Sequence, residues 1–291
     1  MSRSRLLLAL LTVLMLAGSI GLAQWRRRND NDGARTAREI PSDIEPPERW
    51  KNPPGFTKDV FTFARIKYRG NNASRWGRGS GVWWIDAPDS DLNFSYRLQQ
   101  LTSIKADPDG RVVEITDPEL FSFPWVYIVE PGALEFTDEE VPILRRYLLN
   151  GGFLMVDDFW GERQWENFYN EMKRVFPERE PVELGMDHPI FHSVFPLNME
   201  KQKLQVPNFQ TGEMSQYTGV TWERADGEEC REVHFKAIYD DKGRIMVIIC
   251  HNTDLGDGWE REGEYKYYFK EFSEKIAYPL GINIVFYAMT H

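Results

Sequence analysis

The sequence is poor in the residues and motifs that usually mark covalent catalysis or tight cofactor binding. Its 291 residues include two cysteines and five histidines. It contains no G-x-G-x-x-G dinucleotide fingerprint, no Walker A loop, no H-E-x-x-H zinc motif and no G-x-S-x-G nucleophile motif. These absences argue against nucleotide binding, zincin-type proteolysis and serine hydrolase chemistry.

Basic residues are also in short supply. The chain has 35 lysines and arginines against 45 acidic residues, which leaves a formal net charge of −10. Nucleic acid and anionic lipid both require a basic binding face. We therefore expect no nucleic-acid partner, and we attribute the excess negative charge to solubility.

The N-terminus has the three parts of a secretory signal peptide. Residues 1–5 are basic, residues 6–20 are apolar, and small residues follow up to Ala23, where cleavage is expected. The alternative is an uncleaved inner-membrane anchor over residues 6–23, because the run nearly spans a bilayer and three arginines follow it at 26–28. Both interpretations predict an exported chain, periplasmic or extracellular, whose N-terminal segment meets a membrane.

Composition then separates a linker from a folded domain. Residues 24–57 mix charged residues with five prolines and show no apolar period, which predicts a disordered linker. Residues 58–291 are expected to form one α/β domain. An irregular insertion at about 178–232 interrupts its pattern.

Strand and helix patterns alternate along the domain. The apolar runs predict strands at about 60–68, 112–115, 125–129, 153–156, 236–239 and 244–250. Helical spacing predicts helices at about 88–102, 137–150, 161–176 and 268–288, the last of them kinked or split near Pro279 and Gly281, before residues 284–288. This alternation predicts a mostly parallel sheet with helices on both faces, a three-layer αβα fold.

The residues around 151–158 indicate where a site would lie. Thr137 and Glu140 form the capping box of a helix that ends at Gly151. The apolar run 153–156 is too short for a globular helix and is typical of a strand buried on both faces. It ends at Asp157 and Asp158. Because ligands of open α/β sheets bind beyond the carboxyl ends of strands, we expect a site at these two carboxylates.

Other acids and histidines extend this candidate site. His188, His251 and Asp254 lie in predicted loops or at strand ends, and with Asp157 they form a candidate ligand set for a divalent metal ion that activates water. In this hypothesis Asp157, Asp158 and His188 are catalytic. The alternative is structural: Asp158 caps the next helix, Asp157 pairs with an arginine, and His188 forms a hydrogen-bonded turn.

Two further features predict ligand contacts. The glycine-rich loop 69–81 holds Arg75 and Arg78, which are placed to clamp an anion. Trp160 follows the central strand and is suited to stack on a sugar ring or to anchor a partner protein. The alternatives are a solvated loop and a tryptophan that fills the core.

Cys230 and Cys250 allow two interpretations. Cysteines of an exported protein can pair. A simple hairpin about residues 240–243 places Cys250 opposite residue 233, however, so a disulfide needs a bulge or another register. The alternative is two buried thiols, which suits a cysteine inside an apolar strand.

A set of short segments carries a family resemblance. The segments are FARIKY at 63–68, LRRYL at 144–148 with GGFL at 151–154, DD at 157–158, HPIF at 188–191, and LGIN at 280–283 with Tyr287. In this order they resemble the bacterial domain-of-unknown-function 4159 family, from about residue 58 to the C-terminus. The resemblance implies a flavodoxin-like fold of the class I glutamine-amidotransferase-like group, without an assigned activity. Amidotransferases need a cysteine on a strand-to-helix elbow, whereas Asp157 and Asp158 follow the central strand here.

Together these observations predict an exported or membrane-tethered α/β domain. We expect it to act as a non-catalytic binding or assembly module of the cell envelope, with an envelope protein or a small molecule as its partner and without a cofactor. The alternative is a metal-dependent hydrolase of carbohydrate or another small substrate, with a divalent metal ion as its cofactor. The two hypotheses differ in whether the purified chain holds metal.

Overall fold

A seven-stranded, mostly parallel sheet forms the centre of the computed structural model, which describes residues 31, 33–56, 59–71, 82–223 and 227–291. The strand order is β3-β1-β4-β6-β9-β8-β7. The bounds are β1 Ala64–Ile66, β3 Arg111–Val113, β4 Trp125–Val129, β6 Phe153–Asp157, β7 Val182–Glu183, β8 His234–Tyr239 and β9 Ile245–His251. The first five strands in this order are mutually parallel, and β8 is antiparallel to both of its neighbours. Numbered along the chain, the parallel strands follow the order 2-1-3-4-5, which is flavodoxin-like.

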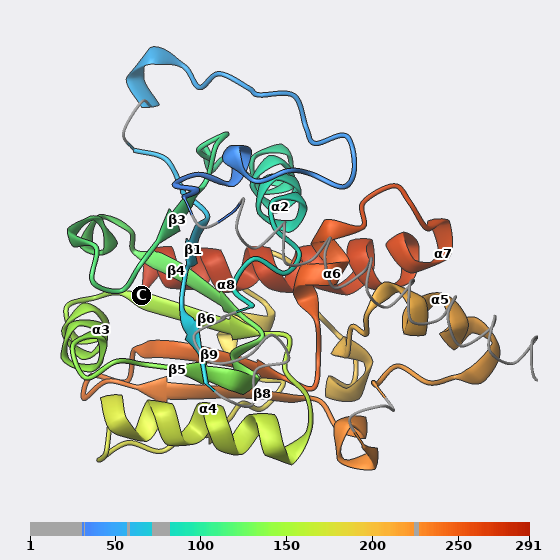
Figure 1. Ribbon diagram of the computed structural model, residues 1–291. Helices are drawn as coiled ribbons and strands as arrows, with labels where there is room; N and C mark the ends of the chain where they lie inside the picture. The colour runs from blue at the N-terminus through green and yellow to red at the C-terminus, as the bar shows by residue number, and fades with distance from the viewer. Residues whose placement is uncertain (1–30, 32, 57–58, 72–81, 224–226) are drawn as a thin grey trace, which may run out of the picture.

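Helices cover both faces of this sheet, as predicted (Figure 1). One face carries α2 Asp89–Leu101, α6 Leu255–Glu260 and α8 Tyr278–Thr290, and the other carries α3 Glu140–Leu149 and α4 Gly161–Val175. Alternate residues of β6 enter opposite cores: Phe153 and Met155 face the first set of helices, and Leu154 and Val156 face the second. The continuous apolar run is therefore explained by burial on both faces.

The remaining elements are short. They are β2 Arg69–Gly70 and β5 Leu134–Glu135, which form a second small sheet, α5 Phe209–Thr218 and α7 Lys266–Tyr268, and the single turns η1 Ala37–Glu39, η2 Pro54–Phe56, η3 Pro118–Ser122, η4 Pro131–Ala133, η5 Pro189–Phe191, η6 Lys201–Leu204 and η8 Glu228–Arg231. Several of them fall within 178–232, the segment predicted to be irregular. Among the described residues, no helix is both long enough and apolar enough to cross a bilayer. The leader predicted at 1–23 lies outside the described residues.

The helix before the central strand begins and ends as its sequence predicts. The backbone N–H of Thr137 donates to Glu140 Oε2 at 2.7 Å, and the N–H of Glu140 donates to Thr137 Oγ1 at 3.2 Å, which completes the capping box. Gly151 then takes a φ of 107°, a backbone conformation that favours glycine. The strand that follows extends one residue beyond the prediction, so Asp157 is its last member.

The C-terminal helix corrects one prediction. A π-helical stretch, η9 Phe269–Ala277, precedes α8, and α8 continues through Pro279 and Gly281 instead of breaking there. Proline near the start of α8 has no N–H to leave unpaired. A Cβ on Gly281 would lie 2.6 Å from ring atoms of Phe94 and of Trp259. The glycine therefore allows close packing of α8 and does not end the helix.

The described part of the segment predicted to be a disordered linker forms hydrogen bonds with the domain. The Trp50 indole N–H donates to the Ala106 carbonyl at 2.9 Å, and the N–H of Ala37 donates to the Asp109 carbonyl at 2.9 Å. The Arg35 carbonyl accepts from the N–H of Val112, at the open edge of β3. Arg35 thus satisfies part of a strand edge that would otherwise be exposed, and Ala37 and Trp50 hold the segment against the loop before β3.

Candidate functional site

Strained backbone gathers at the carboxyl edge of the parallel strands. Glu130, Asp158 and Asn252 directly follow β4, β6 and β9, and their φ angles are 48°, 56° and 59°. Asp86, just before α2, has a φ of 62° and is the fourth such non-glycine residue in the described part of the chain. Left-handed backbone costs energy in residues with a Cβ and clusters at functional sites. Three of these four residues carry carboxylates.

Three of these residues, Asp86, Glu130 and Asp158, line a cavity of about 260 Å³. It lies beyond the carboxyl ends of the neighbouring strands β1 and β4. The chain leaves β1 toward β3 on one side and leaves β4 toward β6 on the other, so this is the point where the strand order reverses. Six carboxylates line it: Asp86, Glu130, Asp158, Glu223, Asp254 and Asp257. We call this cavity the acidic pocket. Asn208 and Phe209 at the start of α5 bring the insertion to its rim.

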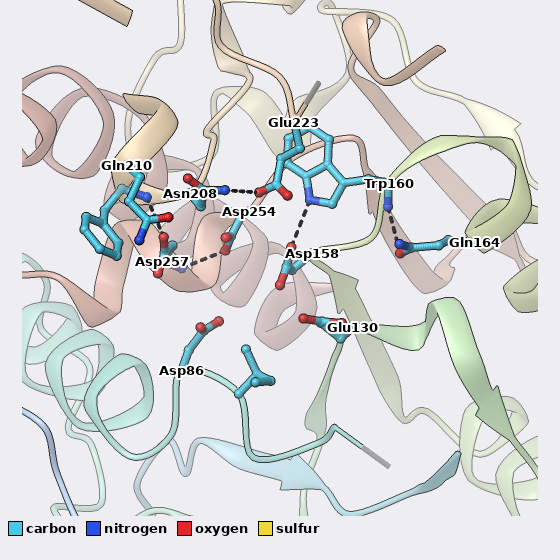
Figure 2. Close-up of a pocket in the computed structure, with 12 residues that line it drawn as sticks. Asp86, Glu130, Asp158, Trp160, Gln164, Asn208, Gln210, Glu223, Asp254 and Asp257 are labelled. Carbon is cyan, nitrogen blue, oxygen red and sulfur yellow. Dashed lines mark hydrogen bonds between the residues drawn. The ribbon is translucent and has the colours of Figure 1, made fainter. Parts of the chain in front are cut away.

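The carboxylates of the acidic pocket converge. Figure 2 shows Asp86, Glu130 and Asp158 directed toward the same central space, with Asp254 beside them. One oxygen each from Asp86, Asp158 and Asp254 lie within 4.8 Å of one another. The same limit holds for Asp86, Asp257 and Glu260. Carboxylate oxygens are the protein ligands that Ca²⁺ and Mg²⁺ prefer.

Burial and mutual repulsion disfavour the charged form of these acids. Burial raises the pKa of Asp86 well above its ordinary value, and the charge of Asp257 raises it further. The pKa values of Asp158 and Asp254 are also raised well above the ordinary value by burial, with Glu130 adding to the first and Asp158 to the second. A bound cation would reverse this effect, since it favours the ionised carboxylates.

A buried arginine supports the chain that carries Asp86. The Arg65 side chain, in β1, has no solvent exposure, and its Nε donates to both oxygens of Asp91 in α2 at 3.1 and 3.0 Å. Its Nη1 donates to the carbonyls of Trp83 and Ile85, at 2.9 Å each. The guanidinium therefore fixes the segment that ends at Asp86.

Asp157 lies beneath the pocket and not in its lining. Its side chain is fully buried, and Oδ2 accepts from the Tyr127 hydroxyl at 3.1 Å and from the N–H of Gly256 at 3.0 Å. Burial raises its pKa to about 7. Asp157 forms these two hydrogen bonds in place of the pairing with an arginine that the sequence allowed. They connect β6 to β4 and to the start of α6, beneath the pocket.

Gly256 is a position where we expect a side chain to disturb the acidic pocket. A Cβ there would lie 2.3 Å from Asp86 Oδ2 and 3.0 Å from the Tyr127 hydroxyl. We expect Gly256→Ala to displace the Asp86 carboxylate, to lower the unfolding free energy by about 1–2 kcal/mol, and to weaken any ligand of the acidic pocket about tenfold. Urea unfolding and ligand titration measure the two effects. Gly243→Ala is the matched control, because nothing lies near its missing Cβ, although its φ of 80° adds strain; equal losses of ligand affinity in both variants would contradict the prediction.

The structure does not bring the four predicted metal ligands together. His188 Nδ1 accepts from the N–H of Ile190 at 3.2 Å, and its ring lies against Tyr287. The Tyr239 hydroxyl lies 3.5 Å from His188 Nε2, and Tyr239 pairs with Ile245 at the start of β9. His188 therefore lies toward the amino ends of the parallel strands, away from the acidic pocket. This histidine forms the hydrogen-bonded turn that was its structural alternative.

His251 also faces away from the pocket. Its ring packs against Phe159 and Trp165, with centroids 4.8 and 5.3 Å away, and its Nε2 lies 3.2 Å from the Gly161 carbonyl. A strand alternates its side chains between faces, which directs His251 toward α4. Asp254, three residues later in the turn, does reach the acidic pocket.

Of the other predicted residues, Asp158 and Trp160 line the pocket together. The Trp160 indole N–H donates to Asp158 Oδ1 at 3.0 Å. Asp158 does not cap α4, the alternative considered for it; Asn252 Oδ1 instead accepts from the N–H of Gly161 at 2.8 Å. Arg75 and Arg78 lie outside the described residues.

Cys230 and Cys250 are both buried, and neither forms a disulfide. Cys250 lies inside β9, where burial raises the pKa of its thiol well above the ordinary value, and Cys230 lies in η8. Neither occupies a strand-to-helix elbow. The elbow between β6 and α4 holds Asp158, so these cysteines lack the position that amidotransferase chemistry requires.

Sequence reasoning missed four of the six carboxylates that line the pocket, namely Asp86, Glu130, Glu223 and Asp257. It also missed Glu260, which adjoins Asp86 and Asp257. Glu130 carried a usable signal, since it follows the buried run 125–129 just as the aspartates follow 153–156. The others gave no local signal, because loops and a short helix bring them to the pocket.

The fold and site together define a flavodoxin-like α/β domain with an acidic pocket at the carboxyl edge of its sheet. The chain belongs to the family described as "Domain of unknown function (DUF4159)", whose model matches residues 62–289. No curated protein matches the chain.

Proposed function

We propose that this domain is a binding module that holds a divalent cation in the acidic pocket and, through it, a small polar ligand. The observation that carries the proposal is the buried, unpartnered oxygen of Asp86. Its Oδ2 is shielded from water and has no hydrogen-bond partner among the described residues, yet it lies in a cavity lined by further acids. A buried charge without a partner is costly, and a cation supplies the missing partner.

The rest of the lining fits a polar ligand held beside such a cation. The side chains of Gln164, Asn208 and Gln210 line the same cavity as the aromatic rings of Trp160 and Phe209. Amides bind hydroxyl groups, and an aromatic ring stacks on the apolar face of a sugar or similar compound. This chemistry supports a small hydroxylated ligand. The basic and apolar N-terminus supports a place in the cell envelope.

Hydrolysis is the second candidate function. Asp158 lines the pocket, and its raised pKa suits a general acid. Asp157 does not reach the cavity, so it is not the residue that would contact a substrate. Turnover of a carbohydrate by the cation-loaded chain, lost in Asp158→Asn, would favour this candidate over binding alone.

The full chain, stripped with a chelator, tests cation binding. We expect Ca²⁺, Mg²⁺ or Mn²⁺ at about 100 times its Kd to raise the melting temperature by about 5–10 °C. Asp86→Asn should lose this response, because it removes the central carboxylate. It should not lower the stability of the stripped protein, since it removes an acid whose buried Oδ2 has no hydrogen-bond partner among the described residues.

Asp138→Asn is the matched control, because Asp138 lies just before α3 and its side chain is exposed to solvent. It should keep the full response to the cation. The proposal fails if none of the three cations at millimolar concentration changes the melting temperature of the parent chain, or if the Asp86 variant responds as the parent does.

A further inference from the structure

Two carboxylate triads share Asp86 at the acidic pocket, and the second extends to Glu260, which does not line the cavity. The first consists of Asp86, Asp158 and Asp254, and the second of Asp86, Asp257 and Glu260. In each triad, one oxygen from every residue lies within 4.8 Å of the other two. Asp86 is the shared member.

We infer that the two triads hold two divalent cations, one in each, with the Asp86 carboxylate bridging them. The inference rests on the proposed function and specifies its cation content. Protein sites with two metal ions hold them roughly 3.5–4 Å apart, a spacing that one bridging carboxylate spans.

The position of Asp86 supports a bridge. Its Oδ2 is buried and has no hydrogen-bond partner among the described residues, and Figure 2 shows its side chain directed into the pocket. The missing side chain of Gly256 leaves room for this oxygen, since a Cβ there would lie 2.3 Å from it. The carboxylate therefore reaches between the strand ends on one side and α6 on the other.

The other ligands come from two separate elements. Asp158 and Asp254 follow β6 and β9, whereas Asp257 and Glu260 lie three residues apart on one side of α6. All four are at most 7% exposed. When they are ionised, acids so deeply buried need compensating charge, and two cations compensate more of them than one.

The two positions are expected to differ in affinity. Arg261 Nε lies 2.9 Å from Glu260 Oε2 and 3.8 Å from Asp257 Oδ1, so a positive charge already neutralises part of the second triad. In the first triad, Asp158 receives one neutral hydrogen bond from Trp160. The first triad should therefore fill first as cation is added.

Titration of the chelator-stripped full chain with Mn²⁺, followed by metal analysis and electron paramagnetic resonance, tests the inference. We expect two Mn²⁺ per chain and the exchange-coupled spectrum of bridged ions. Glu260→Gln should leave one Mn²⁺ with an uncoupled spectrum, and Asp158→Asn should remove the tighter step. Glu264→Gln, four residues along and partly exposed, should keep both ions.

The outcomes separate this inference from the function on which it rests. One Mn²⁺ per chain, unaffected by Glu260→Gln, would overturn the two-ion site and leave the proposed binding function standing. Two ions with an uncoupled spectrum would overturn the Asp86 bridge. No bound Mn²⁺, together with no response to Ca²⁺ or Mg²⁺, would overturn both proposals.

Discussion

Arg65→Met is expected to lower the unfolding free energy of the domain by about 3–5 kcal/mol. The Arg65 and Asp91 side chains are both fully buried, and the substitution leaves the aspartate charged without its partner. The Arg65 guanidinium also donates to four further acceptors: Ser90 Oγ, the second Asp91 oxygen, and the carbonyls of Trp83 and Ile85. Equilibrium unfolding in urea measures the loss. The same variant should weaken cation binding, because these carbonyls position the segment before Asp86.

Two comparisons sharpen this prediction. Arg49→Met removes an ion pair with Asp109 whose arginine is 65% exposed, and we expect it to cost far less stability than Arg65→Met, because solvent screens exposed pairs. Combining Arg65→Met with Asp91→Leu removes the uncompensated charge and should recover part of the stability. If Arg65→Met costs no more than Arg49→Met, the buried pair does not have the role described here.

Acidification is expected to destabilise the domain through His251. Burial lowers the pKa of this histidine to about 3, with the charges of His234 and Lys236 adding to the effect. The unfolded chain, whose histidine titrates near 6.5, therefore binds more protons than the folded one between pH 6.5 and 3. Stability from this group is full above pH 6.5 and is lost as the pH falls toward 3.

The comparison with a non-titrating side chain isolates this contribution. Between pH 7 and 4.5 the parent should lose about 2–3 kcal/mol more unfolding free energy than His251→Gln. Glutamine keeps an N–H for the Gly161 carbonyl, which His251 Nε2 approaches at 3.2 Å, and it does not titrate. Urea unfolding at several pH values measures both slopes. Parallel slopes would show that His251 is accessible to protons in the folded state.

Local sequence signals determined the elements of this fold. The capping box of Thr137 and Glu140, the glycine at 151 and the apolar run after it predicted α3 and β6 to within one residue of the strand's end. These signals act over three or four residues, through caps and side-chain periodicity, so they are readable in the chain itself. The same local logic placed Asp157 and Asp158 at the carboxyl edge of the sheet.

Tertiary structure decided which acids form the site. His251 and Asp254 are three residues apart, yet one faces α4 and the other the acidic pocket, because the chain turns sharply at Asn252. Asp86 enters the pocket because Arg65, distant in sequence, binds Asp91 and the Ile85 carbonyl and so holds the loop between them. The direction of a side chain after a strand depends on the backbone angles of one turn and on long-range contacts that fix them. No pattern of neighbouring residues records those contacts, so the sequence alone located an edge of the sheet and the folded chain selected its ligands.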